Sequence, residues 1–306
     1  MSIIFFGTPD FAVPSLRALL GEGEDVSFVV TQTDKIKGRG HKLAQPAVKI
    51  AALEAGLPVI QPTSLREGKF LEEIASSKPE FLIVVAYGKI LPKALLETPQ
   101  KGCINVHASL LPKYRGAAPI AWAILRGEEK TGVTTMLMDE GLDTGPVLLK
   151  REVAITAEDT AGSLGINLSE VGASLLIETL KGIREGSLKP VPQTGEPTFA
   201  PILRKEDGRI DWSRTALEID HFVRGMQPWP GAFCYMNGEM VRILNARPLP
   251  DKGSAGLIEK ADERDLIIGT GEGLLSIIEI QPSGKRPMSV SAFLQGRRLA
   301  KGMKVG

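Results

Sequence analysis

The sequence predicts an α/β domain with a mostly parallel sheet and helices on both faces, followed by a small β domain. Short apolar runs alternate with helical patterns over residues 1–185, which is typical of strands joined by helical crossovers. From Ile210 onward the pattern changes to short strands separated by turns. The length of 306 residues leaves room for a hydrophobic core in each domain.

In the first domain, the apolar runs that we expect to be buried strands are Ile3–Phe6, Val26–Thr31, Phe81–Ala86 and Ile104–Val106. The segments that we expect to be helical are Phe11–Leu20, Gln45–Ala55 and Ala118–Arg126. A longer amphipathic helix is expected over Ala161–Gly182, where leucines recur at helical spacing.

The second domain follows a proline-rich segment. We therefore divide the chain into a catalytic domain (1–185), a linker (186–208) and a C-terminal domain (209–306). The strands expected in the last part are Met240–Leu244, Gly256–Ile258, Leu266–Gly269 and Leu274–Ile280, with helices near Ala216–Arg224 and Val290–Leu294. This pattern predicts a small β-barrel.

Composition is that of an ordinary globular protein, with 43% hydrophobic and 24% charged residues and a net charge of +1. This charge argues against a protein that coats nucleic acid in general. Cys103 and Cys234 lie far apart in apolar runs and form no metal or redox pattern. We see no signal peptide and no apolar stretch of about 20 residues, so we expect a cytoplasmic protein with no membrane contact.

The strongest functional signal is the run from Gly102 to Gly116, in which a short apolar strand ends in a polar loop. Asn105 and His107 lie two residues apart, so on a strand their side chains point to the same face. Ligands of open α/β sheets bind at the carboxyl ends of strands. Since an amide can donate to a developing oxyanion and an imidazole can shuttle a proton, we expect a site here.

A second signal is the glycine-rich acidic loop Met138–Pro146, which lies between two apolar runs. One of its carboxylates, Asp139, Glu140 or Asp143, is expected to orient His107 or to take a proton. The spacing leaves open which one does so, and such acids are also common in ordinary turns.

The first strand-to-helix turn argues against an oxidoreductase that uses a dinucleotide. Such enzymes need Gly-x-Gly-x-x-Gly, because the pyrophosphate approaches the backbone closely. The chain instead has Gly7-Thr8-Pro9-Asp10-Phe11-Ala12, with a single glycine and a bulky Phe11. We find neither a Walker loop nor a cluster of metal ligands, and we expect no metal.

The residues from Asn105 to Ile120 (NVHASLLPKYRGAAPI), together with Asp139–Pro146 (DEGLDTGP), resemble the formyltransferase family that uses 10-formyltetrahydrofolate. The opening from Phe6 to Leu16 is similar to the members that formylate tRNA. The resemblance continues through Ala154–Thr160, Ile210–Trp212 and Pro228–Ala232, and it therefore covers both halves of the chain. It implies a Rossmann-like first domain and an oligonucleotide-binding-type (OB) barrel.

The resemblance also implies the chemistry and the catalytic residues Asn105, His107 and Asp143. The expected reaction moves the formyl group of 10-formyltetrahydrofolate to the amino group of charged initiator tRNA, for translation initiation. Asn105 and His107 would stabilise the oxyanion, while Asp143 would orient His107 and receive the proton of the amine. No covalent intermediate is required, and we interpret Cys103 as a packing residue. Ala108 stands where many relatives carry glycine.

The folate donor is expected along two segments, by resemblance. A flat heterocycle needs apolar walls with backbone donors and acceptors at its edge, and strand ends broken by glycine and proline provide both. The residues expected to contact it are Tyr87, Gly88, Ile90, Ser109, Leu110, Leu111 and Pro112.

Two basic stretches form an electrostatic footprint suited to the phosphate backbone of tRNA. The first lies between Thr31 and Lys49, and its Gly38-Arg39-Gly40 core matches the family loop that reaches the acceptor end of tRNA. The second runs from Gly284 to the end of the sequence without an acidic residue. The residues expected to contact tRNA are Lys37, Arg39, Lys42, Lys285, Arg297, Arg298 and Lys301.

Two other functions compete with this one. Relatives that formylate a nucleotide-linked amino sugar, or that hydrolyse the formyl folate, share the Asn–His–Asp set but lack the opening motif and the basic loop. A catalytically silent RNA-binding protein is the alternative from another class, and the intact set Asn105, His107 and Asp143 argues against it. We expect no obligatory protein partner.

Overall fold

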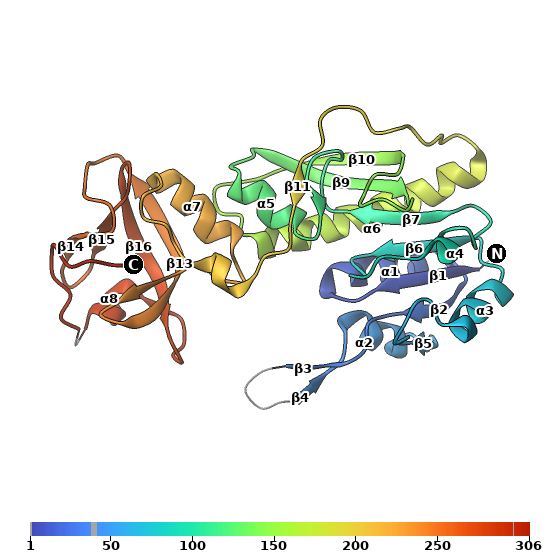
Figure 1. Cartoon of the computed structure of the whole chain (residues 1–306), viewed down its shortest axis with the longest axis horizontal. Helices are drawn as coiled ribbons and strands as arrows, with labels where there is room; N and C mark the ends of the chain where they lie inside the picture. The colour runs from blue at the N-terminus through green and yellow to red at the C-terminus, as the bar shows by residue number, and fades with distance from the viewer. Residues whose placement is uncertain (1, 38–41, 296) are drawn as a thin grey trace. The chain divides into compact units, whose positions relative to one another are not determined.

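The computed structural model describes residues 2–37, 42–295 and 297–306, which form two compact units (Figure 1). The first unit comprises the chain up to Pro119, Lys130–Ala154 and Gly165–Ala200. The second comprises Ile120–Glu129, Ile155–Leu164 and Pro201–Gly306. No helix in the described part of the chain is long and apolar enough to span a bilayer.

A seven-stranded sheet forms the centre of the first unit (Figure 1). Its order is β10-β9-β7-β6-β1-β2-β5, in which the five strands from β7 to β5 are parallel and β9 and β10 are antiparallel. The strands are β1 (Ile3–Gly7), β2 (Val26–Val30), β5 (Val59–Ile60), β6 (Phe81–Val85), β7 (Cys103–His107), β9 (Lys130–Leu137) and β10 (Val147–Ala154). Every residue of β1 and β6 is buried, as expected for parallel strands that are covered on both faces.

The order of the strands decides where the helices lie. The chain runs outward from β1 to β2 and β5, and then returns to β6 and β7 on the other side of β1. Because parallel crossovers are right-handed, this reversal places α1 and α2 on one face and α3 and α4 on the other. Open α/β sheets bind ligands at such a reversal, which here lies between β1 and β6. The expected fold class of this domain is thus confirmed.

The predicted helices all form, with small shifts of their ends. The helices up to residue 185 are α1 (Val13–Gly21, preceded by the 3-10 turn Asp10–Ala12), α2 (Ala47–Glu54), α3 (Gly68–Ser76), α4 (Lys93–Leu96), α5 (Pro119–Leu125) and α6 (Ala161–Glu185). Of these, α5 from Ile120 onward and the start of α6 up to Leu164 belong to the second unit. Sequence analysis did not predict α3 or the single-turn α4. It also missed β3 (Lys35–Lys37) and β4 (Lys42–Ala44), which pair antiparallel in the stretch expected to be a basic loop.

Ion pairs connect the C-terminal end of α6 to residues next to the sheet. Arg184 Nη1 lies 2.6 Å from Glu24 Oε1, and its Nη2 lies 2.8 Å from Glu80 Oε2. Lys101 Nζ lies 3.0 Å from the other oxygen of Glu80, whose side chain is only 1% exposed. Burial opposes the charge of Glu80, but hydrogen bonds from Arg184 and Lys101 outweigh it and hold its pKa below the usual 4.5.

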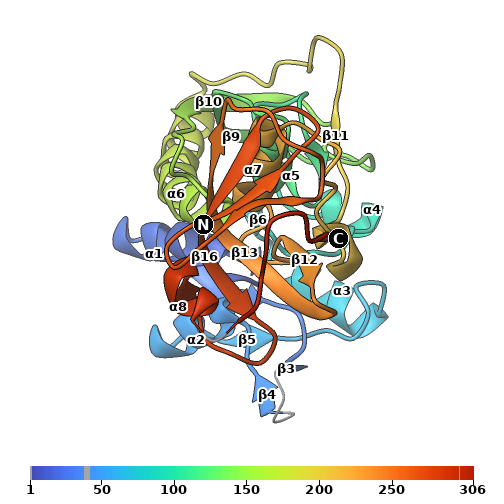
Figure 2. The ribbon, with the colours of Figure 1, turned by 90° about the vertical axis from the view of Figure 1, so that its left-hand side faces the viewer.

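The second unit contains an antiparallel sheet in the order β12-β13-β16-β15-β14, with β17 paired to β16. Figure 2 labels β12, β13 and β16 of this sheet. Its elements are the 3-10 turn Lys205–Gly208, α7 (Ala216–Gly225), β12 (Phe233–Met236), β13 (Glu239–Leu249), β14 (Ile258–Ala261), β15 (Leu266–Gly269), β16 (Leu274–Pro282), β17 (Met288–Ser289) and α8 (Val290–Leu294). The register of β13 shifts around Asn245, and such bulges bend a strand.

The last residues connect the two edges of this sheet. Tyr235 of β12 and Gly306 exchange two backbone hydrogen bonds of 2.9 and 3.1 Å. On the other side, the N–H of Ile258 in β14 donates to the carbonyl of Met303. The curled sheet and this closing segment form the small barrel domain that the sequence predicted.

Candidate functional site

The site begins at the carboxyl end of β7, where the chain places Asn105 and His107. Asn105 is paired with Val84 of β6 and Met136 of β9, and His107 is paired with Thr134 of β9. Asn105 is half-buried and His107 is buried. Their spacing along the strand puts both side chains on one face of the sheet.

Asp143 reaches this strand end from the loop after β9. Its backbone has a φ of +52°, a left-handed conformation that Asp tolerates better than most residues. Two residues later the loop passes so close to β9 that a Cβ on Gly145 would lie 1.9 Å from the carbonyl oxygen of Leu137, so only glycine fits.

The carboxylate of Asp143 connects three groups. Its Oδ2 accepts a hydrogen bond of 2.8 Å from the N–H of Gly116 and lies 3.7 Å from Nδ1 of His107. Its Oδ1 lies 3.4 Å from Nδ2 of Asn105, which is the donor of that pair. The three predicted catalytic residues are therefore brought together at the carboxyl end of β7.

The hydrogen bond on the other ring nitrogen defines the tautomer of His107. Its Nε2 lies 3.0 Å from the carbonyl oxygen of Tyr114, and because a carbonyl only accepts, Nε2 carries a proton. Nδ1 then faces Asp143 and becomes a donor when the ring is protonated. Nδ1 of His107 and Oδ2 of Asp143 are 3.7 Å apart, so the two groups face each other at a distance longer than a direct hydrogen bond.

The other two acids of the loop do not approach His107. Asp139 is exposed and accepts hydrogen bonds from the N–H of Gly141 (3.0 Å) and the hydroxyl of Thr144 (2.6 Å), which is ordinary turn chemistry. Glu140 is exposed and lies 3.5 Å from Lys93.

The seven residues predicted for the donor lie after β6 and β7, but their side chains differ in exposure. Ile90 is 84% exposed, and Leu110 is half-buried. Leu111 and Tyr87 are buried in apolar clusters, so their side chains pack into the core and support the loops instead of lining a surface. Gly88 has a φ of +81°, and a Cβ there would lie 2.6 Å from the side-chain amide of Gln32.

The loop that contains Ser109 and Pro112 is fixed by hydrogen bonds within the first unit. The hydroxyl of Ser109 donates to the carbonyl of Lys113, and the hydroxyl of Thr134 donates to the carbonyl of Ser109 at 2.6 Å. The peptide bond between Leu111 and Pro112 is cis.

The first basic stretch is only partly described. Lys37 ends β3 and Lys42 begins β4, whereas Arg39 lies outside the described residues. Lys49, which adds to the positive charge of this stretch in the sequence, is engaged in an ion pair of 2.9 Å with Asp34.

In the second basic stretch, two of the predicted residues are ion-paired and two are not. Arg297 Nη1 lies 2.5 Å from Glu239 Oε2, and Lys301 Nζ lies 3.7 Å from Glu259 Oε2. The other two predicted contacts, Lys285 and Arg298, are exposed and have no ion pair among the described residues.

Sequence reasoning missed Gln193, which lies in the segment expected to be a linker. Its side-chain amide donates to the backbone carbonyls of Asp143 and Gly145, both at 2.8 Å, and it accepts from Arg115 at 2.7 Å. A single glutamine among prolines carries no pattern that would have revealed this role.

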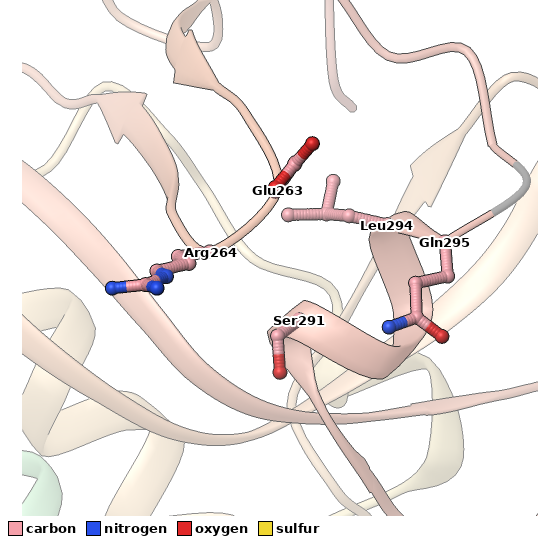
Figure 3. A pocket seen from close by; sticks show the side chains of 5 residues that line it. All are labelled: Glu263, Arg264, Ser291, Leu294 and Gln295. Atoms are coloured by element: carbon pink, nitrogen blue, oxygen red, sulfur yellow. The ribbon is translucent and has the colours of Figure 1, made fainter.

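Other features of the described chain do not belong to this site. Burial raises the pKa of the Cys103 and Cys234 thiols to about 12, in keeping with a packing role. No group of three or more potential metal ligands is found among the residues that the structure describes. A hollow on the C-terminal domain is lined by Glu263, Arg264, Ser291, Leu294 and Gln295 (Figure 3), none of which is a predicted site residue.

Comparison with known proteins identifies the family. The model of the family described as formyl transferase matches residues 1–180, and that of the formyl transferase C-terminal domain matches residues 202–298. A methionyl-tRNA formyltransferase from Thermodesulfovibrio yellowstonii is 54% identical over 98% of this chain and 97% of its own length. One from Caldanaerobacter subterraneus is 49% identical over 99% of both chains.

Solved structures share the fold at low sequence identity. The N-formyltransferase from Helicobacter canadensis, in complex with folinic acid and dTDP-3-aminofucose, has a TM-score of 0.69 at 20% identity, covering 90% of this chain and 97% of that one. HypX from Aquifex aeolicus, in complex with tetrahydrofolic acid, has a TM-score of 0.64 at 22% identity. This match covers 96% of the present chain but only 46% of HypX. The family models and the relatives of high identity show that the chain belongs to the formyltransferase family, among the methionyl-tRNA formyltransferases.

Proposed function

We propose that this enzyme transfers the formyl group of 10-formyltetrahydrofolate to the amino group of methionyl-tRNA, with Asn105, His107 and Asp143 as its catalytic residues. One observation carries the assignment of residues: the Asp143 carboxylate lies within 3.4 Å of the Asn105 amide and 3.7 Å of the His107 ring. The product, formylmethionyl-tRNA, serves translation initiation.

The chemistry requires two different actions at the same place. The amine nitrogen bonds to the formyl carbon, negative charge develops on the formyl oxygen, and the attacking nitrogen loses a proton. The bond from the formyl carbon to the folate nitrogen then breaks, and that nitrogen leaves with a proton as tetrahydrofolate. Asn105 Nδ2 and protonated His107 Nδ1 are the donors for that charge. Asp143 accepts the proton of the amine, directly or through water. The carbonyl of Tyr114 keeps Nε2 engaged, so Nδ1 is the nitrogen that faces the site.

The residues at the ends of β6 and β7 suit the folate donor, which supplies the formyl carbon when bound. Ile90 and Leu110 offer apolar surface that is at least partly exposed, and Gly88 is itself exposed. We assign the further contacts with the folate donor to Ser109 and Pro112. Tyr87 and Leu111 have buried side chains, and we assign contacts with the donor to the loop segments that these side chains hold in place.

We assign the contacts with tRNA to the two basic stretches. Lys37 ends β3 and Lys42 begins β4, and this strand pair extends away from the sheet of the first unit (Figure 1), while Arg39 is assigned from the sequence alone. In the C-terminal domain all four assigned residues are exposed; Arg297 and Lys301 are ion-paired with glutamates, whereas Lys285 and Arg298 have no ion pair among the described residues. Phosphate contacts of this kind provide affinity without reading bases.

The domain assignment extends this proposal. We assign residues 1–185 to catalysis, 186–208 to a linker and 209–306 to tRNA binding. We also propose that the enzyme works in the cytoplasm, where translation starts, and needs no protein partner or membrane for its reaction.

A side-by-side acceptor assay tests the function. The purified chain is given 10-formyltetrahydrofolate with methionyl-tRNA (initiator), uncharged tRNA, free methionine or a dTDP-linked amino sugar. We expect formylation of the charged tRNA alone, and loss of at least about 100-fold in turnover for Asn105→Ala and His107→Ala. Formylation of the amino sugar alone would overturn the proposal, as would release of formate without any acceptor.

A further inference from the structure

The segment that follows α6 makes close contacts with both loops of the site. Val191 exchanges two backbone hydrogen bonds of 2.8 Å with Val147, just after the Asp143 loop. Farther along, β11 (Phe199–Ala200, labelled in Figure 1) pairs with β8 (Arg115–Gly116), directly after Tyr114, whose carbonyl accepts from His107. These residues all belong to the first unit. The segment therefore connects two loops that are distant in sequence.

Gln193 is the one residue between Lys189 and Phe199 whose side chain is not exposed. Both protons of its amide are used, one by the carbonyl of Asp143 and the other by that of Gly145, at 2.8 Å each. Its oxygen accepts from Nη2 (2.7 Å) and Nε (3.2 Å) of Arg115. The orientation of this amide is therefore fully determined by its partners.

These contacts close into a ring around the site. Gln193 holds the backbone of Asp143, the carboxylate of Asp143 accepts from the N–H of Gly116, and Arg115, which precedes Gly116, returns to Gln193. Gly116 has a φ of +119°, and a Cβ there would lie 2.8 Å from the carbonyl of Ala200 in β11. The same segment thus fixes the donor and the acceptor of the Gly116–Asp143 hydrogen bond.

We propose that Gln193 is a positioning residue that fixes the Asp143 carboxylate relative to His107 and Asn105. The inference rests on the proposed catalytic role of Asp143. Asp143 has a left-handed backbone at the turn of an exposed loop, and Gln193 holds the carbonyl of that same residue. Without this hold the loop gains alternative backbone conformations, and the carboxylate spends less time in its productive place.

Two variants distinguish the hydrogen bonds that the amide nitrogen of Gln193 donates from those that its oxygen accepts. Gln193→Glu keeps an oxygen for Arg115 but replaces the donor to Asp143 and Gly145 with a carboxylate oxygen, which repels both carbonyls. Gln193→Met has a similar length and makes none of these hydrogen bonds. The matched control is Gln100→Glu, at an exposed glutamine of the same unit whose amide lies 3.4 Å from the carbonyl of Lys78.

We expect kcat of Gln193→Glu and Gln193→Met to fall about 10- to 100-fold, as a misplaced catalytic group produces. KM for methionyl-tRNA and for the folate donor should stay within about twofold, and Gln100→Glu should match the wild type. A purely structural role would instead lower the thermal midpoint and leave kcat of the folded enzyme unchanged. Turnover of both Gln193 variants within about twofold of the wild type would overturn the proposal.

The same substitutions on an Asp143→Ala background test whether Gln193 acts through Asp143. In single-turnover measurements, Gln193→Glu should cost less than about twofold there, because the group that it positions is gone. An equal loss on both backgrounds would contradict the proposed coupling. Full activity of Asp143→Ala alone would refute the catalytic assignment, and it would do so regardless of the behaviour of Gln193.

Discussion

Replacing Asp143 with asparagine changes the charge of the site with little change in shape. The asparagine oxygen can still accept the hydrogen bond of 2.8 Å from the N–H of Gly116, so the loop should keep its path. The substitution removes the negative charge that lies 3.7 Å from Nδ1 of His107. It also removes the acceptor that we propose for the proton of the amine.

The geometry sets the expected size of the effect. The exposed fractions of the two side chains are 7% for His107 and 15% for Asp143, so solvent screens their interaction only partly. At an effective dielectric constant of about 20, two unit charges 3.7 Å apart attract by on the order of 4 kcal/mol. A loss of about 100-fold corresponds to about 2.7 kcal/mol, and a positioned acid or base contributes about 100- to 10000-fold. We therefore expect kcat to fall at least about 100-fold.

The assay is formyl transfer to methionyl-tRNA at saturating concentrations of both substrates, with thermal unfolding and tRNA titration as checks on folding and binding. Asp139→Asn is the matched control, because it makes the same change in the same loop at an exposed position that only caps a turn. We expect its turnover to stay within about threefold of the wild type. A large loss for Asp139→Asn with none for Asp143→Asn would show that the wrong carboxylate had been assigned.

Three further predictions concern tRNA binding and stability. Replacing Arg39 and Lys42 with alanine should weaken use of methionyl-tRNA and leave folate affinity unchanged; an equal loss of folate affinity would place the hairpin in the donor site. Replacing the exposed Lys285 and Arg298 with glutamine should flatten the slope of log tRNA affinity against log salt concentration by about 1.4–1.8, as measured by tRNA titration at several salt concentrations. An unchanged slope would show that these two side chains do not contact the tRNA. Glu80→Gln should lower the free energy of unfolding by about 2–3 kcal/mol at neutral pH, less than the about 3–5 kcal/mol for a fully buried pair because the basic partners are one-third exposed. Since the folded-state pKa of Glu80 is lowered, this contribution to the free energy of unfolding is present above about pH 4.5 and is lost as the pH falls through the folded pKa. If the Glu80→Gln variant lost as much stability on acidification as the wild type, the assignment to Glu80 would be wrong.

Local pattern was sufficient to predict much of the fold. The apolar runs that became β1 and β6 needed no partner to be recognised, because a strand covered on both faces is apolar throughout, whereas β7 was recognised from Ile104 and Val106 on either side of the polar Asn105. Asn105 and His107 followed from the period of a strand, which puts residues two apart on one face. The role of Asp143 came from the resemblance to a family, since the spacing left three carboxylates equally possible.

The tertiary structure decided what depends on contacts between segments that are distant in sequence. It brings Asp143 to His107 through the left-handed turn at residue 143 and the close approach of Gly145 to β9, whereas Asp139 and Glu140 remain in exposed turns. It also shows which charges are already paired, as in Lys49 with Asp34. Composition indicated only a linker for the segment after α6, yet Gln193 in that segment donates to the carbonyl of Asp143, fifty residues earlier in the chain. Hydrogen bonds of this kind depend on where the fold puts each backbone carbonyl, and no local sequence pattern encodes that position.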